Sequence, residues 1–325
     1  MENVGIIIVN YRTANLVIEN LVSLASENER LGGALKVFVV DNNSNDGSVA
    51  LLVDQIAKNN WSGWITVLPQ QSNWGFAGGN NRALAEILCY DNFCPFIMFL
   101  NPDAAVRAGA IQSSKEFLST RKRVGIVGSQ LVNLDGSLRR SAFRYPSPIG
   151  EFLRSAKTDF FSRLFRHWEI ALAPKGCAHQ ADWVSGAAFM VRRNVIEQIG
   201  LLDDRYFLYY EEVDFMRRAN QSGWQVWHNP ASEVVHLGGQ ATRIRHEVSE
   251  SGPLPDYWYE SWRRYYLKNH GRWRTLLAGF LWILGEVFFL IKTNIQCRGR
   301  QSGAATISKF WQLALSPAFR RSTHT

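Results

Sequence analysis

The sequence predicts an α/β fold in which helices flank a mostly parallel, mixed, Rossmann-like sheet. Short apolar, β-branched runs alternate with segments of helical periodicity through the first half of the chain. These runs are apolar throughout, as expected of strands buried on both faces. Polar residues follow each run where a strand would end, and ligands bind at such strand ends in sheets of this kind.

The elements follow in order along the chain. We predict strands at residues 4–10, 35–41, 64–68 and 96–101, with helices at 13–26, 48–59 and 78–89. Further strands are predicted at 124–132, 183–192, 225–228 and 233–236, and a further helix at 213–220. Residues 146–181 show little periodicity, which is typical of a long functional excursion or a loosely helical flap.

The composition changes near residue 255, which predicts a catalytic domain at 1–255 and a helical extension at 256–325. Residues 276–291 are nearly all apolar, but this run of roughly 16 residues is shorter than the roughly 20 that cross a bilayer. Trp273, Trp282 and flanking cations favour a helix that lies in the membrane interface. The alternative is a buried helix that packs on the core or on a second subunit.

The net charge of +8 predicts an anionic partner, such as nucleic acid, a membrane surface or a phosphorylated substrate. Zinc-finger spacing, a basic zipper and an aromatic RNA-binding signature are all missing, so we expect no nucleic acid. The four cysteines lack CxxC spacing and predict free thiols in a reducing compartment. The first residues lack a signal-peptide pattern and predict a strand instead.

Two segments after predicted strands suit a nucleotide. Asp41 ends the second strand, and its carboxylate can accept the imide N–H of uracil or thymine, with Asn43 in the turn that follows. The alternative is a turn that caps the next helix. Further on, a glycine-rich segment opens a helix and favours a diphosphate or a ribose, with Asn73, Gly75 and Asn80 as its candidate contacts.

Asp103 follows the fourth strand and can bind a hard divalent cation that bridges two phosphates. His236 ends the last strand and is a candidate second ligand. A Pro–Asp turn and a structural histidine are the alternatives. The pair Gly238 and Gly239 predicts a mobile loop directly after this histidine.

Three carboxylates, those of Glu211, Glu212 and Asp214, begin a predicted helix after an aromatic run at 206–210. One of them is a candidate base for deprotonating a hydroxyl group. Neighbouring carboxylates and partial burial would raise its pKa toward neutrality. The alternative is an acidic first turn that complements the helix dipole.

Taken in this order, these segments resemble glycosyltransferase family 2 and its GT-A fold over roughly residues 4–270. The resemblance rests on residues 6–11, 39–48, 73–81, 100–103, 182–187, 207–214 and 235–239. Within the family, the chain is most similar to bacterial rhamnosyltransferases that build O-antigen, the lipopolysaccharide side chain, and other cell-surface polysaccharides.

The resemblance implies a role for each donor-side residue. Asp41 is expected to recognise the donor base, with Asn10 and Tyr11 near the nucleotide. Asp103 matches the second carboxylate of the family's DxD motif. Asn101 replaces the first, and a neutral amide binds a divalent ion less tightly.

The resemblance also implies the remaining roles. His236 is expected to complete a site for Mg²⁺ or Mn²⁺. Glu212 stands where the family usually has an aspartate as catalytic base, with Glu211 as a competing base. The matched segments also imply acceptor contacts from Trp183, Gly186 and Tyr209.

The implied activity is a single displacement that inverts the anomeric centre. The implied donor is dTDP-L-rhamnose, followed by a UDP-hexose or UDP-galactofuranose, and the acceptor is a glycan or lipid-linked glycan. We expect a cytoplasmic enzyme that is peripheral at the inner face of the cytoplasmic membrane. A non-catalytic sugar-nucleotide or glycan-binding protein would not need the carboxylates at 211, 212 and 214. A nucleotidyltransferase would need a glycine-rich loop with a basic residue after the first strand, where this chain has Asn10 and Tyr11.

Overall fold

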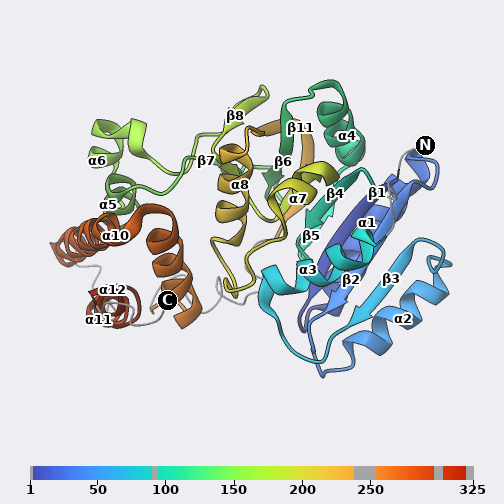
Figure 1. Ribbon diagram of the computed structural model, residues 1–325, viewed down its shortest axis with the longest axis horizontal. Helices are drawn as coiled ribbons and strands as arrows, with labels where there is room; N and C mark the ends of the chain where they lie inside the picture. Colours follow the sequence, from blue (N-terminus) through green and yellow to red (C-terminus); the bar gives the residue numbers. More distant parts are fainter. Residues whose placement is uncertain (1–2, 90–93, 238–252, 296–302, 320–325) are drawn as a thin grey trace. The chain divides into compact units, whose positions relative to one another are not determined.

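The computed structural model describes residues 3–89, 94–237, 253–295 and 303–319 (Figure 1). Contacts divide the chain into an α/β unit and a helical unit. The α/β unit comprises Met1–Phe143, Ala173–Phe207 and Glu211–Ala241, and the helical unit comprises Arg144–Leu172, Leu208–Tyr210 and Thr242–Thr325. The domain boundary expected at residue 255 stays a prediction. The expectations for Gly238, Gly239 and Cys297 lie outside the described residues.

The α/β unit is built on one large mixed sheet. Its order is β3 (Ile65–Pro69), β2 (Leu35–Asp41), β1 (Val4–Asn10), β4 (Phe96–Leu100), β10 (Ala188–Arg192), β6 (Val124–Val132), β11 (Gln225–His236) and β5 (Ala104–Val106), and β8 (His179–Ala181) also pairs with β11. The first four strands are parallel, and β10 is antiparallel to both of its neighbours. Since β11 is parallel to β6, the carboxyl ends of β1, β2, β4 and β11 lie at the same edge.

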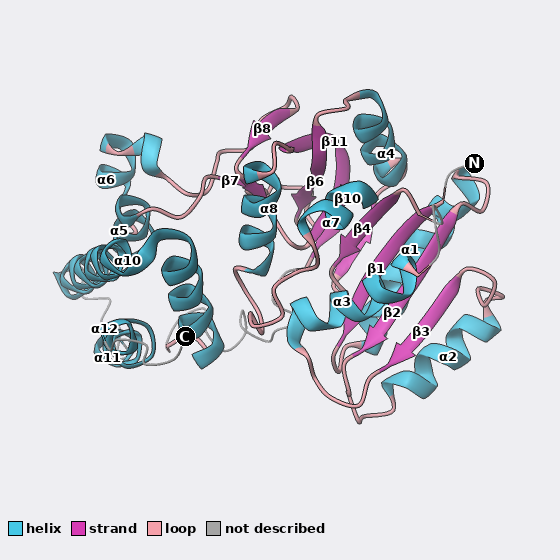
Figure 2. Cartoon of the chain, in the orientation of Figure 1, coloured by secondary structure: helices cyan, strands magenta, loops and turns pink. Residues whose placement is uncertain are grey.

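Helices cover both faces of this sheet (Figure 2). Side chains of α1 (Ala14–Arg30), α2 (Ser48–Lys58) and α4 (Ala110–Thr120) share one apolar core with the strands. The opposite face carries α3 (Gly75–Leu88), α7 (Arg193–Ile199) and α8 (Glu211–Gln221). There, Ile87 lies against Gly5 of β1, and Phe215 packs 6.5 Å from Phe99 of β4. The predicted α/β sheet with helices on both faces is confirmed.

Several elements differ from the sequence prediction. The strands expected at 225–228 and 233–236 are one strand, β11, whose register shifts around Pro230, because proline cannot donate to a ladder. The strand expected at 183–192 is interrupted: β9 (Trp183–Val184) pairs with β7 (Ala142–Phe143), and β10 joins the large sheet. The segment at 146–181 contains α5 (Pro148–Ala156), α6 (Asp159–Leu164) and the 3₁₀ turn η1 (Arg166–Trp168). The structure also contains α4 and β5, which the sequence analysis did not predict.

The helical unit is organised around α10 (Asp256–Ile295), which bends at Gly271, where φ is 72°. It is followed by α11 (Gly303–Phe310), the π-helical turn η2 (Trp311–Leu315) and α12 (Ser316–Phe319). A side chain at Gly285 would meet the Ser155 hydroxyl of α5 at 2.1 Å, so α10 and α5 pack closely. Among the described helices, α10 alone is long and apolar enough to cross a membrane, a test that core helices also pass.

Candidate active site

Asp41 and Asn10 lie side by side at the carboxyl ends of β2 and β1. Asn10 Nδ2 donates to Asp41 Oδ1 at 2.7 Å, and the Ser44 hydroxyl donates to the same oxygen at 2.6 Å. The Ser44 backbone N–H donates to Asp41 Oδ2 at 3.0 Å. A carboxylate has about four lone-pair positions. Three donors therefore hold this buried group in place and leave room for about one more, which suits the imide N–H of a base.

The residues after β1 add further contacts to the group formed by Asn10, Asp41 and Ser44, which we call the nucleotide corner. Arg12 adopts φ of 58°, and its backbone N–H donates to the Ser44 hydroxyl at 2.9 Å. Its guanidinium donates to the Ser44 carbonyl and lies 5.1 Å from the ring centroid of the exposed Tyr11. Asn43 also has a positive φ and is partly exposed. Arg12 was not among the predicted site residues, although a cation just after a strand end suits a diphosphate.

Gly75 joins the nucleotide corner to the segment that precedes α8. Its φ is 68°, and a Cβ there would lie 2.0 Å from the Phe207 carbonyl oxygen. The Phe76 N–H donates to that same oxygen at 2.8 Å. Asn73 accepts from the Gly75 N–H, and Asn42 donates to the Gly75 carbonyl. Only glycine fits this position, because both the φ angle and the close approach exclude a side chain.

Asp103 and His236 meet at the ends of β4 and β11. His236 Nε2 lies 3.1 Å from Asp103 Oδ1 and 3.3 Å from Asn101 Nδ2. Carboxylate oxygen and imidazole nitrogen are ligand types of Mn²⁺, and carboxylates also suit Mg²⁺. The described residues contain no cluster of three or more His, Cys, Asp or Glu able to hold a metal. The donor types of this pair fit a divalent ion, which Asp103 and His236 would hold.

Arg139 stabilises the end of β11 beside this pair. Its Nη1 donates to the His236 carbonyl at 2.7 Å. The sequence analysis did not single out this arginine, since its contact depends on the turn after β6 that brings residue 139 back alongside Leu131. It places positive charge close to Asp103 and His236, where an anionic donor would be neutralised.

Glu211 and Glu212 form the first turn of α8. Glu211 is buried, whereas Glu212 is partly exposed. Among the described residues, Oε2 of each glutamate has no hydrogen-bond partner. Burial raises the pKa of Glu212 to about 7. Burial, and then the charge of Glu212, raise the pKa of Glu211 well above its usual value. Burial thus disfavours the charged form of both carboxyls, and Glu212, with its pKa near neutrality, is suited to accept a proton.

Residues 183–187 connect Glu212 to the end of β4. A Cβ on Gly186 would lie 3.5 Å from Glu212 Cγ, so the two residues are in contact. The next residue, Ala187, accepts a hydrogen bond from the Asn101 N–H at 2.9 Å. Trp183 stacks on Phe143 with ring centroids 4.1 Å apart. The structure thus brings Glu212, Gly186 and Asn101 into one neighbourhood.

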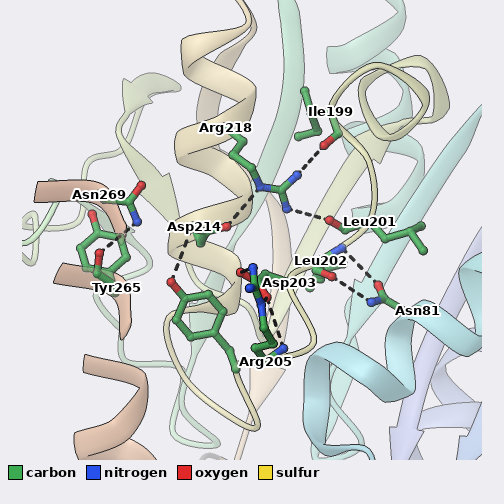
Figure 3. A network of polar contacts seen from close by, with 11 residues as sticks. Asn81, Ile199, Leu201, Leu202, Asp203, Arg205, Asp214, Arg218, Tyr265 and Asn269 are labelled. Atoms are coloured by element: carbon green, nitrogen blue, oxygen red, sulfur yellow. Dashed lines mark hydrogen bonds and ion pairs between the residues drawn. The ribbon is translucent and has the colours of Figure 1, made fainter. Parts of the chain in front are cut away.

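Three candidate residues have other surroundings. Asp214 is buried in an ion pair with Arg218 at 3.1 Å, and Arg218 also donates to the carbonyls of Ile199 and Leu201 (Figure 3). Asn80 donates to the Phe76 carbonyl within its own helix. Both contacts are structural and satisfy the side chains locally. The third, Tyr209, belongs to the helical unit, where its ring lies 6.2 Å from that of Tyr257.

Relatives of this chain are known glycosyltransferases. The chain is 29% identical to the N-acetylglucosaminyl-diphospho-decaprenol L-rhamnosyltransferase of Mycobacterium tuberculosis, over 68% of this chain and 72% of that protein. It is 26% identical to the low-salt glycan biosynthesis hexosyltransferase Agl10 of Haloferax volcanii, over 73% and 67% of the two chains. It is also 23% identical to the rhamnosyltransferase WbbL of Escherichia coli K12, over 74% and 85%.

Solved structures share the fold. A mannosyltransferase from Pyrobaculum calidifontis, in complex with GDP-mannose and Mn²⁺, aligns with 97% of this chain and 81% of its own at a TM-score of 0.53 and 18% identity. Residues 1–349 of TarS from S. aureus align with 97% of this chain and 82% of their own, at a TM-score of 0.52 and 14% identity. The family described as Glycosyltransferase like family 2 matches residues 2–273. The chain therefore belongs to glycosyltransferase family 2, and it is a glycosyltransferase with the GT-A fold.

Proposed function

We propose that this enzyme transfers L-rhamnose from dTDP-L-rhamnose to a lipid-linked glycan, with inversion, during synthesis of a bacterial cell-surface polysaccharide. The observation that carries the proposal is Glu212, a partly exposed residue whose carboxyl pKa is raised by burial to about 7 and which contacts Gly186, next to the end of β4. Two relatives are rhamnosyltransferases, and the name of one describes a lipid-linked diphosphate acceptor.

The chemistry is a single displacement. Glu212 takes the proton of the acceptor hydroxyl as that oxygen attacks the anomeric carbon, and the bond from this carbon to the diphosphate breaks. Attack comes from the face opposite the leaving group, so one displacement inverts the configuration. Burial, and then the charge of Glu212, disfavour a second negative charge on Glu211 beside it.

Asp103 and His236 would hold Mg²⁺ or Mn²⁺. When bound, the ion would neutralise charge on the departing diphosphate. Asn101 offers an amide where the family has a carboxylate, so we expect weaker metal binding than at a full DxD site. The similarity to a mannosyltransferase in complex with Mn²⁺ supports a divalent ion.

Asp41 and Arg12 would bind the nucleotide. The Asp41 carboxylate is fixed by three donors and would accept the imide N–H of the base, while Arg12 would face the diphosphate. Thymine and uracil share this N–H, so Asp41 does not choose between them. A UDP-hexose or UDP-galactofuranose is therefore the second candidate donor, which the archaeal hexosyltransferase relative favours.

A nucleotide-release assay tests the donor. The purified protein is offered dTDP-L-rhamnose, UDP-galactose and UDP-galactofuranose with an N-acetylglucosaminyl-diphospho-lipid acceptor, with and without EDTA. We expect release only from dTDP-L-rhamnose, an inverted product and inhibition by EDTA. If nucleotide is released only from a UDP-sugar, that sugar nucleotide is the donor instead of dTDP-L-rhamnose. A product with retained anomeric configuration would refute the single displacement. Glu212→Gln should be inactive, whereas Glu86→Gln, an exposed control, should match the wild type.

We also propose that the enzyme docks on the inner face of the cytoplasmic membrane through one face of α10. Exposed apolar side chains recur there every three or four residues and form what we call the apolar stripe: Trp273, Leu277, Phe280, Leu284, Phe288 and Ile291. With about 1.5 Å per residue, the stripe is about 27 Å long. Exposed apolar area of this length is rare on soluble proteins.

The opposite face of the helix is buried within the helical unit. Gly279 packs against Leu315, Gly285 packs against α5, and Glu286 is buried. Only one side of the helix is thus available to lipid, which favours a helix lying in the interface over one that crosses the bilayer. Arg274 and Lys292 flank the stripe and complement anionic headgroups.

Flotation with vesicles tests this docking. We expect the protein to float with vesicles that contain phosphatidylglycerol and much less with pure phosphatidylcholine. The double variant Leu277→Glu/Leu284→Glu should stay in the soluble fraction. Leu134→Glu, which changes an exposed leucine of the α/β unit, should float like the wild type. Equal flotation of all three proteins, or flotation of none, would refute the proposal.

A further inference from the structure

The chain leaves the α/β unit for three residues immediately before its catalytic helix. Leu208–Tyr210 belongs to the helical unit, while Phe207 before it and Glu211 after it belong to the α/β unit. Tyr209 and Tyr210 have φ values of 73° and 69°. Side chains other than glycine rarely adopt this left-handed region, so surrounding contacts must hold the segment in place.

Contacts to α10 hold the first two residues of this segment. The Leu208 carbonyl accepts a hydrogen bond from the Ser261 hydroxyl at 3.0 Å. The Tyr209 ring lies 6.2 Å from the Tyr257 ring, nearly parallel to it. Both contacts come from the first turns of α10, which thus provides a platform for the segment.

Arg154 of α5 contacts the last residue. Its Nη1 donates to the Tyr210 hydroxyl at 3.1 Å, and its guanidinium lies 4.9 Å from the ring centroid of Trp258. The Tyr210 ring is buried, with the Tyr265 ring 5.3 Å away. Tyr210 is therefore held at its ring by aromatic packing and at its hydroxyl by one cation.

Glu151 fixes this arginine. Its fully buried carboxylate forms an ion pair with Arg154 and accepts a hydrogen bond from the Tyr266 hydroxyl at 2.9 Å. A buried carboxylate is costly unless it is paired and hydrogen-bonded, and here both conditions are met. The order Tyr266, Glu151, Arg154, Tyr210 is thus a continuous polar chain that ends one residue before Glu211.

We propose that Arg154 is a positioning residue: by holding the Tyr210 hydroxyl it fixes the left-handed Tyr209–Tyr210 pair and thereby sets where Glu211 and Glu212 begin α8. The inference rests on the proposed role of Glu212 as base. It assigns the helical unit a second task besides membrane docking, namely orienting the catalytic carboxylates through the backbone. In this proposal Arg154 acts on the glutamates only through Tyr210 and the backbone that follows it.

Two single-oxygen deletions in the same polar chain separate positioning from stability. Tyr210→Phe removes the hydroxyl that Arg154 holds, and Tyr266→Phe removes the hydroxyl at the far side of Glu151. We expect kcat of Tyr210→Phe to fall about tenfold, since small misplacements of catalytic groups are costly. Its donor KM should stay constant, and the acidic limb of its pH–rate profile should move below 7. Tyr266→Phe should lose thermal stability but keep kcat and the limb.

Hydrogen exchange supplies a readout that does not depend on activity. Backbone amides at 209–214 should exchange about fivefold faster in Tyr210→Phe and Arg154→Lys than in Tyr266→Phe, as expected when one hydrogen bond is lost. Equal exchange in all three variants, or an unshifted pH profile in Tyr210→Phe, would overturn the proposal. If exchange responds but Glu212→Gln remains active, the proposed base is wrong and the positioning contact stands.

Discussion

Two groups of buried carboxylates near one end of the sheet differ in their partners. Asp41 accepts three hydrogen bonds, from Asn10 and from the side chain and backbone of Ser44. Glu211 and Glu212 each have an Oε2 with no hydrogen-bond partner among the described residues. Three donors fix the position of the Asp41 carboxyl, whereas burial raises the pKa of Glu211 and Glu212 and disfavours their charged forms.

The difference assigns separate tasks to the two groups. A carboxylate that is fixed before the substrate arrives can accept a hydrogen bond from the substrate without reorganising. A base must instead change its charge during the reaction and is most effective when its pKa lies near the working pH. We therefore expect Asp41 to recognise the base of the sugar donor and Glu212 to act as the catalytic base.

Glu212→Gln is the variant with the largest expected effect. Loss of the base should lower kcat by about 10²- to 10⁴-fold. The pKa of Glu212 is raised in the folded state, so its stabilising contribution is present below pH 4.5 and is lost as pH rises through about 7. Glutamine stays neutral, so the variant should melt higher than the wild type at pH 8 but not at pH 4.5. Thermal melts at both pH values check this. A variant that melts lower than the wild type at pH 8 would contradict the claim that burial raises the pKa of Glu212.

The pH dependence of the wild type is the next test. Only the ionised form of Glu212 accepts a proton, so kcat should fall about tenfold per pH unit below about 7. Steady-state rates between pH 5 and 9, with saturating donor and acceptor, measure this limb. A flat profile down to pH 5 would mean that the base has an ordinary carboxyl pKa.

Asp41→Asn should affect binding more than catalysis. In this variant an amide nitrogen replaces one carboxylate oxygen and faces hydrogen-bond donors that the oxygen now accepts from. Each donor left without an acceptor costs about 1–3 kcal/mol. We expect donor KM to rise about tenfold, as the same energy range implies, while kcat stays within about threefold. Asp46→Asn, in the exposed part of the same loop, is the control and should leave KM unchanged. A fall in kcat as large as that of Glu212→Gln would erase the distinction between the two groups.

Asp214→Asn should have the smallest effect on the reaction. Asp214 shares the first turns of α8 with the glutamates but is paired with Arg218. Weakening this pair should lower stability by about 1–3 kcal/mol, measured by urea unfolding. We expect kcat to stay within about twofold, because the ion pair with Arg218 already engages the carboxylate. Loss of activity in a folded Asp214→Asn protein would identify it, rather than Glu212, as the base.

The sequence predicted the strands, because apolar runs and the polar residues that end them are local signals. The same local signals single out Asp41, Asp103, Glu212 and His236, whose roles stay predictions. The sequence did not predict α4, whose first turn has no acidic residue and which follows Gly109 at φ of 82° rather than a polar cap. Propensity is weak there, and packing on the sheet decides the structure.

Other site features depend on contacts that no local pattern encodes. Arg12, Tyr209 and Tyr210 are non-glycine residues with positive φ, which sequence reasoning does not anticipate. The roles of Arg139 and Arg154 arise from bonds to distant segments. Asp214 and Glu212 are equivalent candidates in the sequence, and the structure distinguishes them by the ion pair of Asp214 with Arg218.

The contact between Gly75 and the Phe207 carbonyl has a consequence for biosynthesis. It joins two segments that are far apart in the chain, and such a closure requires that both have been made. During translation, the amino-terminal strands can pair early, because their partners are near in sequence. The junction between the residues around Gly75 and the segment before α8 must then wait for residue 207 to leave the ribosome. A nascent chain paused before that point would hold a folded half-sheet but no finished site, so truncated products should be unable to sequester the activated sugar.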